Sequence, residues 1–159
     1  MCQRIISGGQ TGVDRGALDA CQANIFPCGG WCPKDRLAED GKIDPKYPLT
    51  ETKDRNYDTR TRENVQDSTG TLIITSGDLS GGTLLTYQFA KTINKSVLIV
   101  LPAKNDLHKL ISEIILWMDE YNIIVLNVAG PRKSEWEQGY HFSYQIISAL
   151  ILKIKSSIH

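Results

Sequence analysis

Two glycine-rich turns, each lying between a short apolar run and a helix-like segment, constrain this chain more than any other feature. Residues 4–7 lead into Gly8-Gly9-Gln10-Thr11-Gly12, and residues 71–75 lead into a turn that ends in Ser80-Gly81-Gly82-Thr83. In such a turn, glycines let the backbone approach a ligand while the N–H groups at the start of the helix face negative charge. The first turn has the spacing of neither the dinucleotide fingerprint nor the P-loop. The pair therefore predicts an anion site without naming its ligand, and a merely tight turn is the alternative.

The rest of the chain repeats the same alternation. Short apolar runs at Ile5 and at residues 71–75, 96–101 and 123–128 are typical of strands buried on both faces. Between and after them, helical spacing covers residues 14–23, 82–94, 107–121 and 138–156. This alternation predicts an α/β fold with a mostly parallel, doubly wound central sheet flanked by helices. Both glycine turns then fall at the carboxyl ends of strands, where they can converge on one crevice.

Length and charge narrow the possible partners. The 159 residues are expected to form one domain, 1–159, and 18 basic residues balance 18 acidic ones. Zero net charge argues against a nucleic-acid partner held by bulk electrostatics. The longest apolar stretch is too short for a membrane span and no leader opens the chain, so we expect a cytoplasmic protein without a membrane partner. The apolar final helix suggests a homo-oligomer.

One stretch breaks the alternation. Residues 26–57 are rich in glycine and proline and show no sustained period, which predicts a long irregular excursion with one short strand at its start. Four cysteines, Cys2, Cys21, Cys28 and Cys32, lie in or before it, and free thiols are expected in a reducing compartment. Cys28 and Cys32 lack the partners that a zinc site needs, so no metal ligand is assigned.

Several motifs together carry a family resemblance. The chain is similar to the proposed molybdenum carrier family, the circularly permuted YpsA-like branch of the SLOG superfamily. The resemblance covers nearly the whole chain, in order, and is carried by residues 5–19, Gly29-Gly30-Trp31-Cys32-Pro33-Lys34, Ala38-Glu39-Asp40-Gly41, residues 47–52, Arg60-Thr61, Asn64-Val65, Asp67-Ser68, residues 81–86 and residues 127–132.

The resemblance implies a Rossmann-like three-layer sandwich with a crevice for a phosphorylated small molecule. It also implies a link to carrying molybdenum cofactor, a pterin that bears a phosphate and a dithiolene-bound oxometal. A carrier of that cofactor needs an anion cradle and a sheltering cleft. A nucleotide would satisfy the same cradle, so the bound ligand stays open between molybdenum cofactor and a nucleotide.

The same superfamily includes phosphoribohydrolases, whose glycine loop carries a glutamate. In this chain Thr86 occupies the position of that glutamate, and a hydroxyl cannot replace a carboxylate as a base. This departure counts against hydrolysis of the same type. The alternative function is nevertheless a nucleotide-processing hydrolase, with Glu39, Asp40 or Asp67 supplying the carboxylate. A third interpretation is a regulatory domain that senses a nucleotide or other metabolite.

The predicted ligand-binding residues combine the two loops with nearby cations. Loop glycines are expected to offer N–H groups to a phosphate, and Asp14 to cap its helix or order the loop rather than touch an anion. Arg60 and Lys34 rank first among the cations, and Trp31 can stack on a planar ring or cover the edge of the core. No catalytic residue is assigned. The full set is Gly8, Gly9, Gln10, Thr11, Gly12, Arg15, Trp31, Lys34, Arg60, Asn64, Ser80, Gly81, Gly82, Thr83, Thr86 and Arg132.

Overall fold

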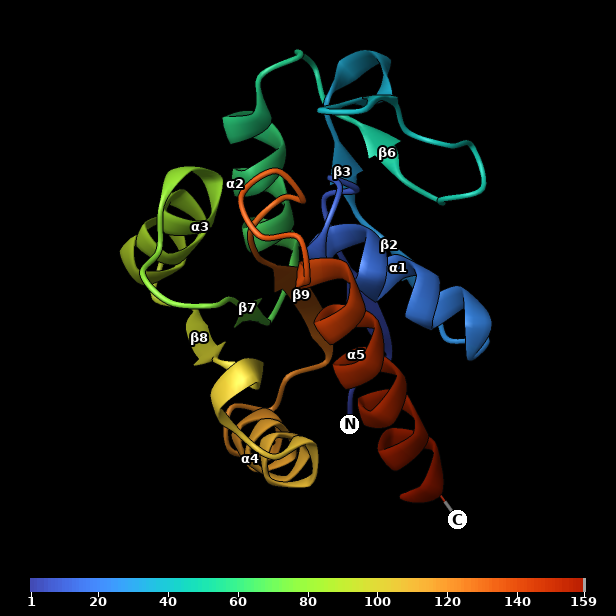
Figure 1. Ribbon diagram of the computed structural model, residues 1–159, viewed down its shortest axis with the longest axis vertical. Helices are drawn as coiled ribbons and strands as arrows, with labels where there is room; N and C mark the ends of the chain where they lie inside the picture. Colours follow the sequence, from blue (N-terminus) through green and yellow to red (C-terminus); the bar gives the residue numbers. More distant parts are fainter. Residues whose placement is uncertain (159) are drawn as a thin grey trace.

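Five parallel strands form the centre of the computed structural model, which describes residues 1–158. They lie in the order β2 (Cys28–Gly29), β1 (Arg4–Ile6), β9 (Val125–Ala129), β7 (Gly70–Ile74) and β8 (Ser96–Val100) (Figure 1). All five residues of β7 are buried, as expected for a strand with neighbours on both edges and helices on both faces.

Helices cover both faces of this sheet. Packed on one face are α1 (Val13–Ala23), α4 (Leu107–Glu120) and α5 (Gly139–Ser156), and on the other α2 (Tyr57–Asp67) and α3 (Gly81–Thr92) (Figure 1). The short 3₁₀ helix η2 (Pro102–Lys104) joins β8 to α4. The predicted three-layer α/β sandwich is therefore confirmed. None of the helices described in residues 1–158 has the length and apolarity needed to cross a membrane.

The predicted strands and helices are present, with ends that differ by at most two residues apart from the three-residue β1. One helix, α2, was not predicted from the sequence. Asn56 begins it by accepting a hydrogen bond from the Asp58 N–H. Most of its buried residues are polar, and Val65 is the one apolar residue among them, so no apolar stripe marks the helix in the sequence.

Helix α5 packs within the chain rather than facing outward. Its apolar residues Ile146, Ile147, Leu150 and Ile154 all lie in the main core, and α1 is its principal neighbour. Gly16 makes this close packing possible, because a Cβ there would lie 2.5 Å from the Tyr140 carbonyl oxygen. The apolar pattern that suggested a homo-oligomer is therefore explained by packing inside one chain.

The excursion between α1 and α2 is more ordered than expected. Beyond β2 it holds η1 (Lys34–Arg36) and two small ladders, β3 (Trp31–Cys32) with β6 (Thr50–Glu51) and β4 (Leu37–Ala38) with β5 (Gly41–Lys42). The prediction of a single short strand was wrong, because two-residue ladders leave no periodic signal.

Buried contacts hold the excursion in place. A second small core beneath it contains Leu18 of α1 together with Cys32, Ile43 and Tyr47. The Arg36 guanidinium donates hydrogen bonds to backbone carbonyls of the excursion, among them Asp44 at 2.8 Å and Tyr47 at 2.9 Å. One arginine thus fixes a segment that has little regular secondary structure.

Candidate functional site

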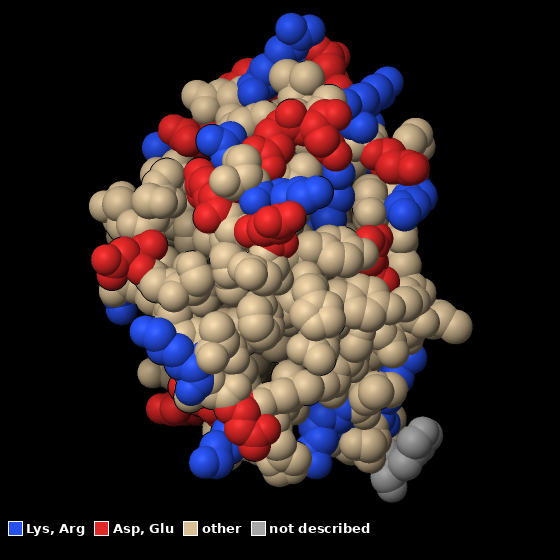
Figure 2. Space-filling view, viewed as in Figure 1, with Lys and Arg blue, Asp and Glu red and all other residues tan. Residues whose placement is uncertain are grey.

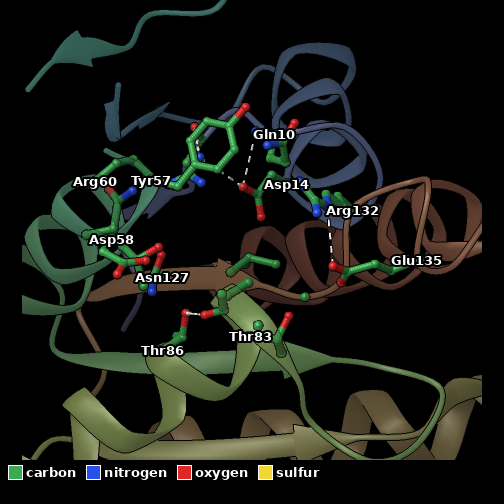
Figure 3. Close-up of a pocket in the computed structure, with 18 residues that line it drawn as sticks. Gln10, Asp14, Tyr57, Asp58, Arg60, Thr83, Thr86, Asn127, Arg132 and Glu135 are labelled. Carbon is green, nitrogen blue, oxygen red and sulfur yellow. Dashed lines mark hydrogen bonds and ion pairs between the residues drawn. The ribbon is translucent and has the colours of Figure 1, made fainter. Parts of the chain in front are cut away.

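A cavity of about 180 Å³ opens where strands β1 and β9 end. Four segments line it: the first glycine loop with the start of α1, the cavity-facing side of α2, the first turns of α3, and the end of β9 with the loop that follows (Figure 3). Its lining residues are Gly8, Gln10, Asp14, Tyr57, Asp58, Arg60, Thr61, Asn64, Gly81, Gly82, Thr83, Thr86, Asn127, Val128, Ala129, Gly130, Arg132 and Glu135.

The structure brings together nine of the sixteen predicted site residues. These nine are Gly8, Gln10, Arg60, Asn64, Gly81, Gly82, Thr83, Thr86 and Arg132. The other seven, which lie outside the cavity lining, are Gly9, Thr11, Gly12, Arg15, Trp31, Lys34 and Ser80.

The start of α3 faces the cavity with its backbone donors open. Ser80 is its N-cap residue, yet among residues 1–158 no side chain caps the helix, and its first turn contains no acidic residue. The first N–H groups of a helix have no partner within the helix. A Cβ on Gly82 would meet nothing within 4 Å, so this approach is unobstructed. The second glycine loop therefore has the geometry of an anion cradle.

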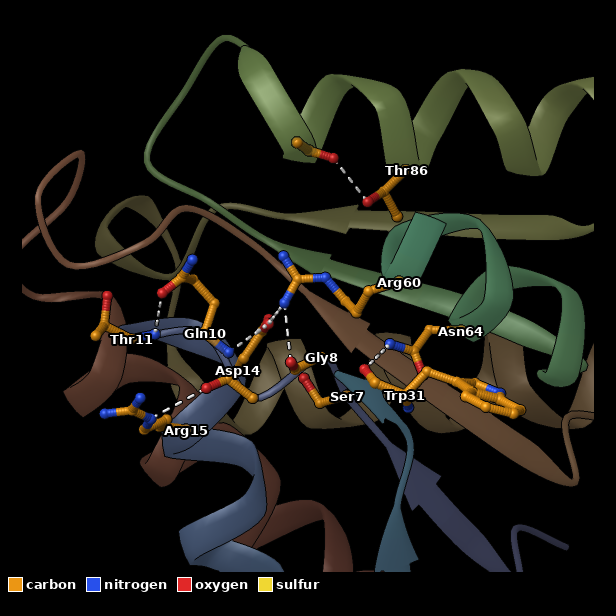
Figure 4. Close-up of polar contacts among 12 residues, drawn as sticks. Ser7, Gly8, Gln10, Thr11, Asp14, Arg15, Trp31, Arg60, Asn64 and Thr86 are labelled. Atoms are coloured by element: carbon orange, nitrogen blue, oxygen red, sulfur yellow. Dashed lines mark hydrogen bonds and ion pairs between the residues drawn. The ribbon is translucent and has the colours of Figure 1, made fainter. Parts of the chain in front are cut away.

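Thr86 lies one turn into the same helix. Its hydroxyl donates to the Gly82 carbonyl oxygen at 2.8 Å, so its proton is used within α3 (Figure 4). The residue at the position of the hydrolase glutamate thus acts as an intrahelical hydrogen-bond donor in this structure.

Arg60 enters the cavity from α2 and is only 7 % exposed. Its Nη1 donates to the Gly8 carbonyl oxygen at 2.8 Å and lies 4.0 Å from the Asp14 carboxylate (Figure 4). The guanidinium also lies over the Tyr57 ring, 5.3 Å from its centroid. Burial lowers the Arg60 pKa from its usual value, while Asp14 opposes that shift. A cation this deeply buried favours an anionic partner.

Asp14 is an acidic residue that was predicted from the sequence not to contact the ligand. It accepts a hydrogen bond from the Gln10 N–H at 3.2 Å and, at 8 % exposure, lines the cavity. Burial raises the Asp14 pKa, and the Arg60 charge partly offsets this effect. Its predicted role in ordering the loop fits this bond, but it also forms the carboxylate half of a buried ion pair with Arg60.

The first glycine loop is occupied by the protein's own groups. The Gln10 N–H bonds to Asp14, and the Thr11 N–H donates to the Gln10 side-chain oxygen at 3.0 Å. The Val13 N–H donates to the Pro131 carbonyl oxygen at 3.4 Å. A Cβ on Gly12, whose φ is +82°, would lie 2.7 Å from that same oxygen. This loop therefore packs against the segment after β9 instead of presenting a row of free donors.

The remaining predicted cations are placed differently. Arg15 lies outside the cavity and binds the Asp40 carboxylate, with Nη2 at 2.8 Å, and the Gly9 carbonyl oxygen. Lys34 is exposed on η1. Arg132 does line the cavity, where its Nε lies 3.3 Å from Glu135 and 3.5 Å from Glu39. Arg60 and Arg132 thus lie on opposite sides of the cavity (Figure 3).

Trp31 and Asn64 fasten the excursion to α2. The Trp31 N–H donates to the Asn64 side-chain oxygen at 2.8 Å, and the Asn64 amide donates back to the Trp31 carbonyl at 2.9 Å (Figure 4). The Trp31 indole N–H donates to Asp67 at 2.6 Å. Asn64 lines the cavity, but these two bonds engage both ends of its amide.

The three carboxylates assigned to the hydrolase alternative do not line the cavity. Asp40 binds Arg15, Asp67 accepts from Trp31, and Glu39 accepts from Thr11 and Ser134. The carboxylates that do line it are Asp14, Asp58 and Glu135, which the sequence analysis did not assign. Asn127 also lines the cavity and was not assigned to the site. Its signal in the sequence is clear, because it is a polar residue inside the apolar run of β9.

Glu39 connects the excursion to the loop that carries Arg132. Its carboxylate accepts hydrogen bonds from the Thr11 hydroxyl, the Ser134 N–H at 3.1 Å and the Ser134 hydroxyl at 2.6 Å. Partial burial raises the Glu39 pKa, but the hydrogen bonds from Ser134 and Thr11 outweigh it and hold the pKa below its ordinary value. Glu39 is therefore a tether at the rim of the site.

Comparisons with known proteins agree with this architecture. The model of the circularly permutated YpsA SLOG family matches residues 5–151. Among solved structures, the crystal structure of a "putative molybdenum carrier protein" from Syntrophus aciditrophicus SB is similar, with a TM-score of 0.91 and 40% sequence identity over 94% of each chain. No curated protein gives a significant match.

Proposed function

The chain belongs to the circularly permutated YpsA SLOG family, and from this premise we propose that its cavity binds the phosphate end of a small molecule, either a nucleotide or a phosphorylated pterin. One observation carries the proposal: the buried guanidinium of Arg60 lines the same cavity as the uncapped first turn of α3. A guanidinium and open helix N–H groups are complementary to a phosphate.

The size of the cavity sets which part of the ligand it encloses. At about 180 Å³ it is smaller than the roughly 300–1,000 Å³ of pockets that bury a whole drug-sized ligand. It accommodates a phosphate and leaves a ring system at its mouth. Tyr57, the first residue of α2, lines the cavity with its ring and offers a flat surface to a base or a pterin (Figure 3).

The carboxylates in the cavity lining restrict the class of ligand further. Asp58 and Glu135 line the cavity in addition to the paired Asp14, and they would repel a ligand that is anionic throughout. They can instead accept hydrogen bonds from hydroxyl or amino groups. The preferred ligand therefore has one anionic end and a neutral part rich in donors, as nucleotides and phosphorylated pterins have.

Carrying molybdenum is the more specific form of this proposal. The similar solved protein is described as a putative molybdenum carrier, and a phosphorylated pterin fits the charge pattern of the cavity. Hydrolysis is the less favoured function, because the carboxylates expected to act in it are bound elsewhere and Thr86 cannot serve as a base. The third interpretation, a regulatory domain that senses a metabolite without turnover, would use the same cavity to bind that metabolite.

Isothermal titration with AMP, inorganic phosphate and adenosine tests binding directly. We expect AMP to bind most tightly and adenosine most weakly. Gly82→Asp should abolish AMP binding, because it places a carboxylate at the start of α3. Gly77→Asp is the matched control: a Cβ there also meets nothing within 4 Å, but Gly77 does not line the cavity. Equal AMP affinity for the two variants, or no binding of either AMP or inorganic phosphate at millimolar concentration, would contradict the proposal.

Native mass spectrometry of gently purified protein, with elemental analysis, separates the functions. A pterin mass accompanied by molybdenum, absent from Gly82→Asp, supports the carrier. A retained nucleotide supports nucleotide binding, and chromatography of incubated AMP then tells a binding protein from a hydrolase. Release of adenine from AMP would replace the carrier with the hydrolase.

A further inference from the structure

The strand β8 ends the central sheet with an unpaired edge. No strand among residues 1–158 pairs with its outer side, whereas β7 pairs on both sides. Residues 96–98 are half-buried and Ile99 is 38 % exposed. The strand contains no charged residue and no proline, which are features that usually protect an edge from pairing with another chain.

The cation beside this edge does not protect it. Lys95 directly precedes β8, but its Nζ donates to the carbonyls of Ser68 at 2.7 Å, Val65 at 3.2 Å and Gln66. Those carbonyls lie at the end of α2, so Lys95 caps that helix. At the opposite edge of the sheet, β2 is only two residues long and continues into the excursion. The two edges therefore differ in length and in how open they are.

The helix beside β8 adds exposed apolar surface. A shallow groove lies between β8 and α4, lined by Leu98 and by side chains along one side of that helix. Leu116 and Tyr121, which directly follows α4, both line this groove. Leu116 is 69 % exposed and Tyr121 is 53 % exposed. This surface continues from the strand edge onto the helix.

Within its first and last turns, α4 carries charges that oppose its own dipole, while its N-cap Asp106 is acidic and accepts a hydrogen bond from the His108 N–H. Lys109 lies in the first turn, which contains no acidic residue, and the last turn contains Asp119 and Glu120 but no basic residue. Acidic residues near the start and basic residues near the end would be favoured. Lys109 and Glu120 both line the groove and are eleven residues apart, about three turns, which places them on one side of the helix. An antiparallel copy of α4 would oppose each of them with the opposite charge.

We propose that two copies of this chain associate through β8, antiparallel about a two-fold axis, so that the two sheets become continuous. The symmetry places the two α4 helices side by side on one face, with Lys109 of each copy opposite Glu120 of the partner subunit. A two-fold interface requires a surface that is complementary to itself. An uncharged strand edge, exposed apolar groups and a helix with opposite charges at its two ends meet that requirement. The interface does not involve the cavity.

Light scattering after size exclusion, with the full chain, tests this assembly. Wild type is expected at twice the chain mass of 17.7 kDa. Lys109→Glu and Glu120→Lys should each weaken dimerisation by about tenfold or more, because each sets like charges against one another across the interface. The double variant Lys109→Glu/Glu120→Lys should recover it, and Ile99→Lys should abolish it by guarding the edge.

Leu152→Lys is the matched control, since Leu152 is 61 % exposed on α5, away from β8. It should leave the dimer intact, and circular dichroism should show every variant folded. A wild type that stays monomeric at about 100 µM, or a double variant no better than the single ones, would overturn the proposal. Disruption by Leu152→Lys, with Ile99→Lys still dimeric, would also overturn it and place the interface on α5.

Discussion

The two glycine loops have the same local design but different surroundings. Each follows a strand, turns through glycines and starts a helix without a side-chain cap. In the first loop the N–H groups of Gln10, Thr11 and Val13 are bound by Asp14, the Gln10 side chain and the Pro131 carbonyl. In the second loop Gly82 faces open space. The motif alone therefore does not tell an anion cradle from a packing joint, because neighbouring segments decide which donors stay free.

Arg60 joins the two loops, since it binds the carbonyl of Gly8 and shares a cavity with α3. Arg60→Met should lower the free energy of unfolding by about 3–5 kcal/mol, because it leaves the buried Asp14 carboxylate without its cation. Urea denaturation measures the loss. The double variant Arg60→Met/Asp14→Asn should recover most of it, and a cost below about 1 kcal/mol for the single variant would show that the pair is not structurally coupled.

Gly12→Ala tests the view that the first loop is a packing joint. We expect a loss of about 3 kcal/mol, because an alanine is strained at φ +82° and its Cβ would lie 2.7 Å from the Pro131 carbonyl oxygen. Thermal and urea unfolding provide the measurement. A variant as stable as wild type would mean that the loop after β9 is free to move away from the first loop.

Glu39→Gln probes the rim between the loops and gives a pH signature. At neutral pH it should cost about 1 kcal/mol, through weaker hydrogen bonds from Ser134 and Thr11. Because the Glu39 pKa is lowered in the folded state, the stabilisation is present above its ordinary value of 4.5 and disappears as the pH falls through the folded pKa. Unfolding curves of wild type and variant should therefore converge in acid. Curves that stay equally far apart at every pH would argue against the tether.

Gly82→Ala is the counterpart of Gly12→Ala in the open loop, and we expect the smallest effect on stability, with the opposite sign. Alanine in place of a helical glycine should stabilise the protein by about 0.5–1 kcal/mol, since nothing lies within 4 Å of the new Cβ. Titration with AMP should at the same time show weaker binding, because the methyl group enters the cavity. Destabilisation would indicate that the second loop is packed after all.

The sequence predicted the layers of the fold because apolar runs and helical spacing are local signals. It did not predict α2, whose buried face carries Arg60, Thr61 and Asn64 in place of an apolar stripe. This omission also affected the site, since Tyr57 and Asp58 lie on the same helix and were not assigned. Polar residues buried for a site leave no periodic pattern, so a helix that contributes five lining residues was the hardest element to recognise.

The sequence by itself determined the alternation of strands and helices, the positions of both glycine loops and the family resemblance, because these depend on residues close together in the chain. Only the tertiary structure decided which loop stays open. The Asp14 and Gln10 side chains bind the nearby N–H groups of Gln10 and Thr11. The Pro131 carbonyl that binds the Val13 N–H, and Arg60, which reaches Gly8 across 52 positions of sequence, come from distant segments. Spacing along the chain does not encode these long-range contacts.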